Sequence, residues 1–291
     1  MRNRWVGGIL LMIGIVCALA PSPVYAKRPR VFVACETYSL RDYMSQGKYD
    51  YISVMKLMKE LGIKGITLND IWMKSYDKAY LDQIKQAAKE NGIIIVGLIC
   101  EGDLASDNED ARKQQIQEDA KKIEAAAYLG GRIVRFNLGG TGDPKRDGTD
   151  GVQRVIAAFN ELLPIAKRLG VKMTIENHGG VSAKSEYILK VIKGTDPKWV
   201  GSCLDFKNWP ADVLYQENAA LAPYAYHVHA KSHSFNADGE ESLVDYGRLI
   251  KMLKDAHYIG AISIEFEGPG DQIEGVKKTR DLIEKYWEKN W

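Results

Sequence analysis

Closely spaced cysteine pairs are missing from this 291-residue sequence, which has four cysteines in all. The composition therefore gives no sign of a structural zinc-thiolate site or of a small disulfide-stapled domain. Cys35, Cys100 and Cys203 each lie inside an apolar run, which predicts buried thiols. One disulfide between two of them stays open, because strand-end positions do not show which pair meets.

A net charge is missing too, once the first residues are set aside. Residues 1–26 resemble a secretion signal, in which Arg2 and Arg4 precede an apolar run over 6–20 and Val24-Tyr25-Ala26 fits a cleavage site. Without this segment, 38 basic and 38 acidic side chains remain. The charge balance therefore gives no support to a nucleic acid partner.

The apolar run is also too short for a membrane anchor. A spanning helix needs roughly 20 apolar residues, and Pro21 and Pro23 end this run early. Lipid attachment at Cys17 is disfavoured because Val16 is not the small residue that such a site prefers. We predict an exported, periplasmic or secreted protein without stable membrane insertion.

A repeating order of elements is present. Short apolar runs alternate with amphipathic stretches eight times, and glycine ends most of the amphipathic stretches. The predicted strands are 31–35, 65–68, 93–99, 133–137, 171–176, 199–205, 225–230 and 261–266. The predicted helices are 51–61, 77–90, 108–129, 151–169, 182–192, 211–221, 245–257 and 271–287.

Strands that are separated by helices pair in parallel through right-handed crossovers. Eight of them in a chain of this length favour a closed barrel over an open doubly wound sheet. The open sheet is further disfavoured because Glu36-Thr37-Tyr38-Ser39-Leu40, not a glycine-rich dinucleotide turn, follows the first strand. We predict a single-domain (β/α)8 TIM barrel over residues 27–291.

Polar residues at the carboxyl ends of the last four strands form the candidate active site of such a barrel. Glu176, Asp205, His229 and Glu265 are separated by 29, 24 and 36 residues, each about one β/α unit. Three converging carboxylates repel unless a cation binds them. We predict that the four residues bind one divalent ion, with Mn²⁺, Co²⁺, Mg²⁺ and Zn²⁺ all compatible.

Two other interpretations of these residues stay open. Each residue is a polar group that suits a strand end by itself, with hydrogen bonds to its neighbours. Arg135 and Lys231 also fall on predicted strand ends, where each is able to neutralise one carboxylate. Four ligand-type residues in register favour the metal site.

Five segments carry a resemblance to a known family. They are ETYSLRD at 36–42, LGGRIVR at 129–135, TIENH at 174–178, HVHAK at 227–231 and YIGAISIEFE at 258–267. In this order they resemble the xylose isomerase-like barrel superfamily, in its sugar phosphate isomerase/epimerase branch, over nearly the whole chain after residue 26. The resemblance implies metal ligands at Glu176, Asp205, His229 and Glu265, and it does not fix the substrate.

The sequence departs from two branches of that superfamily. The AP-endonuclease branch needs further histidine ligands, whereas this sequence has Asn208, Asn137 and Glu101 at the corresponding places. Ketose 3-epimerases carry an arginine six residues after the ligand histidine, where Phe235 stands here. DNA repair and standard free-ketose epimerisation are therefore disfavoured.

The resemblance and the positions at strand ends suggest roles for further residues. We predict catalytic roles for Glu176, Glu265, Lys231 and His178, with proton transfer by the two glutamates. His178 has helix capping as its alternative, and His227 is predicted to lie in the core. A substrate-binding ring is predicted from Glu36, Glu101, Arg135, Asn137, Asn208, Trp72 and Trp209, although the two tryptophans fit a hydrophobic plug equally well.

The predicted function is a divalent-metal-dependent isomerase or epimerase that forms an enediolate from an unphosphorylated keto-sugar. Unphosphorylated carbohydrate is favoured because no glycine-rich phosphate cradle follows strands seven and eight. The same intermediate serves a 3-keto-glycoside lyase or hydratase. A non-catalytic sugar-binding barrel is the alternative from a different class, and homo-oligomerisation stays open.

Overall fold

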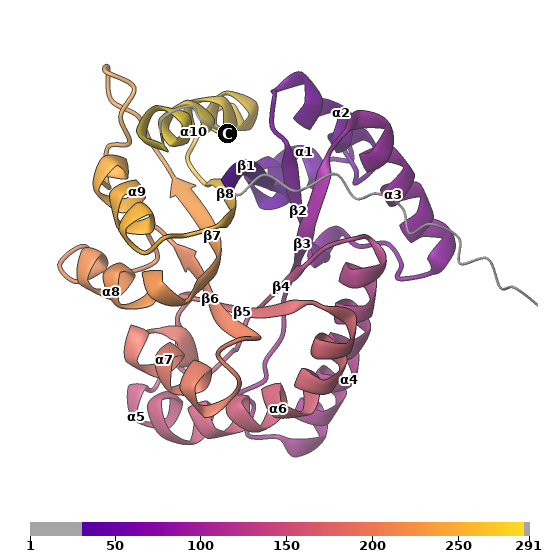
Figure 1. The fold of residues 1–291 in the computed structure, drawn as a ribbon, viewed down its shortest axis with the longest axis vertical. Coiled ribbons are helices and arrows are strands. Elements are labelled where there is room, and N and C mark those ends of the chain that lie inside the picture. Colours follow the sequence, from indigo (N-terminus) through magenta and orange to yellow (C-terminus); the bar gives the residue numbers. More distant parts are fainter. Residues whose placement is uncertain (1–30, 288–291) are drawn as a thin grey trace, which may run out of the picture.

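Eight parallel strands form a closed barrel in the computed structural model of the protein, which describes residues 31–287 (Figure 1). The predicted signal segment, residues 1–26, lies outside the described residues. The strands run in chain order around the barrel, and the last strand pairs with the first. The predicted TIM barrel is therefore confirmed.

The strands are β1 (Val31–Glu36), β2 (Gly65–Asn69), β3 (Ile94–Cys100), β4 (Ile133–Phe136), β5 (Lys172–Glu176), β6 (Val200–Asp205), β7 (Ala225–Ser232) and β8 (Gly260–Phe266). The helices are α1 (Arg41–Ser45), α2 (Ser53–Glu60), α3 (Lys78–Asn91), α4 (Glu109–Tyr128), α5 (Pro144–Arg146), α6 (Val152–Leu169), α7 (Ser185–Gly194), α8 (Leu214–Leu221), α9 (Tyr246–Asp255) and α10 (Gln272–Trp287). Short turns of 3-10 helix follow β1, β2 and β5 and precede β7.

Local chemistry explains several helix boundaries. Asn108 caps α4 by accepting hydrogen bonds from the backbone of Asp110 and Ala111. Gly92 follows α3 with a φ of 70°, a left-handed conformation that favours glycine. The predicted helix at 182–192 begins later, at Ser185, because a 3-10 turn over Gly180–Ser182 comes first.

The barrel interior is apolar at one end and polar at the other. Phe32, Ala34, Val96, Ile133 and Ala261 form a small apolar cluster, separate from the large core that includes the strands' outer faces and the helices. Because side chains two apart on a strand share a face, Glu36, Arg135 and Glu265 continue these rows toward the carboxyl ends. The fold thus gathers buried polar residues at one end of the barrel.

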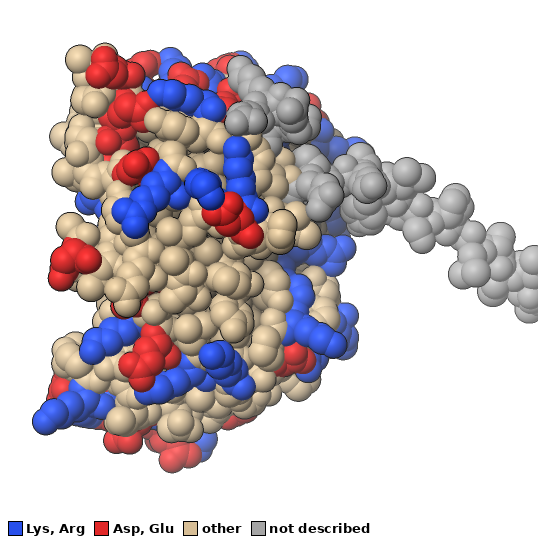
Figure 2. Space-filling model, turned by 60° about the vertical axis from the view of Figure 1, so that its left-hand side comes forward, with Lys and Arg blue, Asp and Glu red and all other residues tan. Residues whose placement is uncertain are grey.

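The distribution of charge on the surface and the apolar character of the helices are two further features of the fold. Figure 2 shows Lys, Arg, Asp and Glu interspersed on the face that it displays, with no stripe of one sign. Among residues 31–287, no helix combines the length and apolar character that crossing a membrane requires.

Candidate active site

The four predicted metal ligands come together at the carboxyl ends of β5 to β8. One ligand atom from each of Glu176, Asp205, His229 and Glu265 lies within 4.8 Å of all the others, and all four residues are buried. Nδ1 of His229 lies 3.3 Å from Oε1 of Glu176 and 3.3 Å from Oε2 of Glu265. The β6–β7 register, which pairs Asp205 with His229, brings two of them directly side by side.

Several ligand atoms at this point have no hydrogen-bond partner. Oδ2 of Asp205, Oε2 of Glu265 and both nitrogens of His229 are buried without one among the described residues. Buried polar atoms of this kind are costly unless something binds them. Three carboxylates with one imidazole form an oxygen-rich donor set that fits a divalent cation.

Arg135 and Lys231 also reach the site, as the alternative interpretation of the sequence proposed. Nε of Arg135 lies 2.5 Å from Oε2 of Glu176. Nζ of Lys231 lies 3.4 Å from Oδ2 of Asp205 and 3.4 Å from Oε2 of Glu265.

These two cations do not balance the acidic groups around them. Arg135 and Lys231 face five carboxylates within ion-pair distance, which belong to Glu101, Glu176, Asp205, Glu265 and Glu267. A negative excess therefore remains beside the four ligands. Arg135 and Lys231 therefore neutralise part of the negative charge of the carboxylates, and this leaves room for a divalent ion to neutralise more of it.

The electrostatics follow from the same contacts. Burial opposes ionisation of Glu176, but Arg135 and His229 lower its pKa to about 2. Burial raises the pKa of Asp205 well above its usual range, despite Lys231, and nearby Glu265 and Glu176 add to this effect. Without a metal ion, the site thus favours keeping one carboxyl group protonated.

Four predicted substrate-binding residues form hydrogen bonds with one another or with the site. Nη1 of Arg135 and Nδ2 of Asn137 donate to Glu101, at 2.9 and 2.7 Å. The Glu101 side chain is 42% exposed, which makes it an accessible group beside the buried ligands. Asn208 donates to Oε1 of Glu176 at 3.2 Å and accepts from Lys231 at 2.9 Å.

The other predicted residues, Glu36, His178 and Trp72, differ in how far they are exposed to solvent. Glu36 is fully buried, and burial raises the pKa of its carboxyl group to about 8. His178 is exposed, and its backbone N–H donates to Oγ of Ser182. Trp72 is half-buried, and its ring centroid lies 6.1 Å from that of Tyr38.

Trp209 requires a correction. Its side chain is 5% exposed and packs in the hydrophobic core, so the plug is the interpretation that its position supports. Trp209 lies four residues after Asp205, in the loop beyond β6, and this position in the sequence did not show whether its side chain is buried in the core or lines the site.

Two residues at the site were missed. Asn177 donates to the carbonyl of Asp205 at 3.1 Å and accepts from its N–H at 2.9 Å, which ties β5 to β6. Oε1 of Glu267 lies 3.2 Å from Nζ of Lys231. Strand alternation could have found Glu267, which is two residues beyond Glu265, whereas no sequence signal gives the partner of Asn177.

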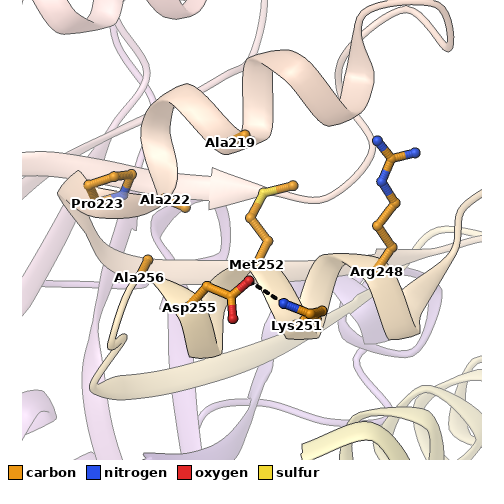
Figure 3. A pocket seen from close by; sticks show the side chains of 8 residues that line it. All are labelled: Ala219, Ala222, Pro223, Arg248, Lys251, Met252, Asp255 and Ala256. Carbon is orange, nitrogen blue, oxygen red and sulfur yellow. Dashed lines mark hydrogen bonds and ion pairs between the residues drawn. The ribbon is translucent and has the colours of Figure 1, made fainter.

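A groove elsewhere on the surface lies apart from this site. Figure 3 shows the side chains that line it, which come from α8, the 3-10 turn that follows it, α9 and the residue after α9, and include the ion pair of Lys251 with Asp255. The volume of the groove is about 400 Å³. None of the predicted site residues lines it. The groove is therefore separate from the residues that converge at the carboxyl end of the barrel.

The fold and the site together define a class of protein. It is the closed (β/α)8 barrel with buried carboxylates and an imidazole at the carboxyl ends of its strands. The family model described as xylose isomerase-like TIM barrel matches residues 45–286. The chain belongs to this family.

Solved structures of sugar epimerases have the same fold. D-psicose 3-epimerase from Clostridium cellulolyticum H10, in a structure with D-tagatose, superposes with a TM-score of 0.72 at 15% identity over 88% of this chain and 99% of that one. 3-Keto-D-glucoside 4-epimerase from E. coli gives a TM-score of 0.69 at 16% identity over 89% and 100%. At this identity the likeness establishes the fold.

Two curated relatives match shorter parts. The 3'-dehydrocarminate deglycosidase alpha subunit of Microbacterium sp is 44% identical over 50 residues, which are 17% of this chain and 14% of that protein. An uncharacterized protein of Methanocaldococcus jannaschii is 25% identical over 201 residues, 63% of this chain and 66% of that protein. The chain thus spans less than two thirds of the length of both relatives.

Proposed function

We propose that this protein is an exported enzyme that uses a divalent metal ion to move a proton at the carbon next to the carbonyl group of an unphosphorylated keto-sugar. The observation that carries the proposal is the convergence of three carboxylates and one imidazole within 4.8 Å, in a buried site with excess negative charge. Barrels of this class place their active sites at this end.

When bound, a divalent ion supplies a Lewis acid for the carbonyl and hydroxyl oxygens of the substrate. Asp205 and His229 hold that ion without a further role. Lys231 is positioned by Asn208 and Glu267, and it donates hydrogen bonds to the developing negative charge on the substrate oxygens.

The two glutamates are not equivalent as proton acceptors. Glu176 is tied to Arg135, and its side chain is 1% exposed, whereas the side chain of Glu265 is 9% exposed. Arg135 stabilises the ionised form of Glu176 and so opposes its protonation. Burial opposes ionisation of Glu265 too, but Lys231 and His229 likewise lower its pKa well below its ordinary value, so accessibility is what separates the two. We assign removal of the substrate proton to Glu265 because its side chain is the more exposed of the two.

The fate of the proton then defines the reaction. Epimerisation returns a proton to the opposite face of the same carbon and needs a second donor, for which Glu176 is the candidate. Isomerisation returns the proton from Glu265 to the neighbouring carbon. We place isomerase/epimerase chemistry first, in keeping with the fold's resemblance to sugar epimerases.

A second candidate is β-elimination, or the reverse hydration, on a 3-keto-glycoside. The contact between Arg135 and Glu176 favours it, because elimination needs one base where epimerisation needs two proton-transfer groups. The local 44% identity to a 3'-dehydrocarminate deglycosidase subunit supports the same substrate class. In this reaction Glu265 removes the proton, and the glycosidic oxygen leaves with its bonding electrons and is protonated by solvent.

Proton NMR of keto-sugars and 3-keto-glycosides in heavy water tests both candidates, with protein that is supplied with Mn²⁺, Co²⁺, Mg²⁺ or Zn²⁺. Deuterium at the carbon next to the carbonyl, without loss of the aglycone, supports the first candidate. Release of the aglycone supports the second. A protein that binds the ion and the sugar but exchanges no deuterium is the non-catalytic sugar-binding barrel, and this result would refute the proposed enzyme.

Export is part of the proposal and needs its own test. Residues 1–26 support it through their composition alone. Mass spectrometry of the protein from cells that express the full sequence should find an amino terminus near Lys27. An intact amino terminus on protein retained inside the cell would contradict export.

A further inference from the structure

A second cluster of ligand-type side chains lies one step deeper in the barrel than the proposed ion. It consists of Cys203, His227 and His229, with the sulfur and one nitrogen from each imidazole all within 4.8 Å of one another. All three residues have no exposed surface. The β6–β7 register pairs Cys203 with His227, directly below the pair of Asp205 and His229.

His227 is unpartnered in this cluster. Both of its nitrogens are buried, and neither has a hydrogen-bond partner among residues 31–287. A neutral imidazole has one N–H donor and one lone pair, and each buried group left without a partner costs about 1–3 kcal/mol. The hydroxyls of Thr67 and Ser263, which are also buried, lack partners as well. His227 is thus one of several buried polar side chains of the described barrel that have no hydrogen-bond partner.

We infer that Cys203, His227 and His229 form a second metal position that takes thiophilic cations such as Zn²⁺, Cd²⁺ or Cu⁺. One thiolate and two imidazoles form a soft donor set. The site of Glu176, Asp205, His229 and Glu265, here called the upper site, has three carboxylate ligands that suit harder cations. The position of Cys203, His227 and His229 is called the lower position. Binding replaces the thiol proton of Cys203, which passes to solvent. Three ligands leave a fourth coordination position for a water molecule.

The two positions compete for His229. Its Nδ1 lies 3.3 Å from the carboxylates of Glu176 and Glu265, on the side of the upper site. A neutral imidazole offers a single lone-pair nitrogen, since the other nitrogen carries the ring proton. His229 therefore serves one ion at a time, and a soft cation in the lower position weakens binding in the upper one. The lower position is inhibitory for any activity that uses the upper ion.

Titration of metal-free protein with Cd²⁺, followed by ultraviolet absorption, tests the inference. We expect a thiolate-to-cadmium charge-transfer band, which the oxygen-rich upper site does not produce. Cys203→Ser should abolish the band and retain Mn²⁺ binding, measured by electron paramagnetic resonance. Cys100→Ser is the matched control, because Cys100 is an equally buried strand cysteine in the core on the helix side, and it should keep the band.

A second variant keeps the inference falsifiable if Cys203→Ser does not fold. His227→Asn should weaken Cd²⁺ binding by at least about tenfold and leave Mn²⁺ affinity unchanged. Excess Mg²⁺ or Mn²⁺ should weaken the band in the unsubstituted protein, as expected for competition at His229.

The outcomes separate this inference from the proposed function. A band that persists in the Cys203→Ser variant, or no band in protein that binds Mn²⁺, would overturn the second metal position. A band that depends on Cys203, in protein that binds no Mn²⁺, would leave the second position standing and contradict the proposed upper site.

Discussion

Arg135 is a guanidinium group held against a carboxylate that we assign to metal binding. Its Nε lies 2.5 Å from Glu176, and its side chain is 3% exposed. Burial would lower the pKa of Arg135, but Glu176 and Glu101 raise it above its ordinary value, so the charge persists. Arg135 thereby fixes the orientation of Glu176 and keeps it ionised before any ion binds.

Removal of that charge gives the first prediction. Arg135→Met should leave Glu176 as an uncompensated buried anion and destabilise the metal-free protein by about 3–5 kcal/mol. Urea unfolding monitors this loss, and Mn²⁺ should recover part of it by replacing the missing positive charge. Arg132→Met, at an exposed residue just before β4, is the control and should change little. Equal losses with and without Mn²⁺ would argue against a shared role for the ion and Arg135.

Glu265 carries the second prediction at the residue scale. Glu265→Gln should lower turnover about 10²–10⁴-fold, because the amide does not accept the substrate proton. Metal binding should be retained or weakened, since one oxygen ligand remains. Glu274→Gln, on the exposed side of α10, is the control. Unchanged turnover of a substrate found by deuterium exchange would remove Glu265 from the mechanism.

At the scale of elements, Asn177 links two strands that supply metal ligands. Its side chain pairs with both the N–H and the carbonyl of Asp205, and it is 1% exposed. This pair continues the β5–β6 contact past the last paired residues, Glu176 and Cys203. Asp205 is thus held by a neighbouring strand end and by its own strand.

Asn177→Ala should destabilise the protein by about 1–3 kcal/mol for each buried backbone group that loses its partner. Calorimetric titration should also find weaker Mn²⁺ binding, because Asp205 loses its lateral support. The control, Asn160→Ala, removes an exposed amide of α6 and should affect neither quantity. Lower stability with unchanged metal affinity would restrict Asn177 to a structural role.

Helix α4 contributes a pH-dependent element. Asp119 is 1% exposed, and burial raises its pKa from 3.8 to about 7, despite Lys122 at 3.6 Å. At low pH the carboxyl group is neutral in both the folded and the unfolded chain. As pH rises toward 7, the unfolded chain ionises first, so this group lowers the free energy of unfolding.

Asp119→Asn should remove that dependence. The free energy of unfolding of the variant, relative to the unsubstituted protein, should increase between pH 4 and pH 7 by at most about 4 kcal/mol, since each pKa unit corresponds to about 1.4 kcal/mol. Urea unfolding at several pH values measures the trend. Asp110→Asn, exposed on the same helix, should leave it flat. A decrease with pH would show that Lys122 holds Asp119 ionised.

How far the sequence predicted these features depends on whether they repeat along the chain. Short apolar runs between amphipathic stretches, with glycine after most of the helices, predicted every strand and long helix, because the strands are buried on both faces and the helices on one. The positions of Glu176, Asp205, His229 and Glu265 at the carboxyl ends of consecutive strands, about one β/α unit apart, predicted their convergence. The contact of Arg135 with both Glu101 and Glu176 depends on side-chain rotamers across three strands, which periodicity does not contain. The burial of Trp209 could not be predicted from periodicity either, because it depends on the conformation of an irregular loop.

At the scale of the whole molecule, negative charge is concentrated at the carboxyl ends of the barrel strands, where a bound cation would neutralise it. Asp205 has a pKa raised well above its usual range by burial, with Glu265 and Glu176 adding to it, although Lys231 lies 3.4 Å away. In the metal-free protein, the site therefore favours one protonated carboxyl group and contains buried polar atoms without hydrogen-bond partners. An ion that binds the folded but not the unfolded chain stabilises it by mass action.

Addition of Mn²⁺ to metal-free protein should raise the free energy of unfolding by about 2.7 kcal/mol at an ion concentration 100 times the dissociation constant. Thermal unfolding at increasing Mn²⁺ measures this, and a chelator should reverse it. Asp205→Asn provides the decisive comparison. It removes one ligand charge and the need to keep a carboxyl group protonated, so the metal-free variant should be at least as stable as the unsubstituted protein while its stabilisation by Mn²⁺ disappears. A variant that is stabilised by Mn²⁺ as strongly as the unsubstituted protein would locate the ion elsewhere in the molecule.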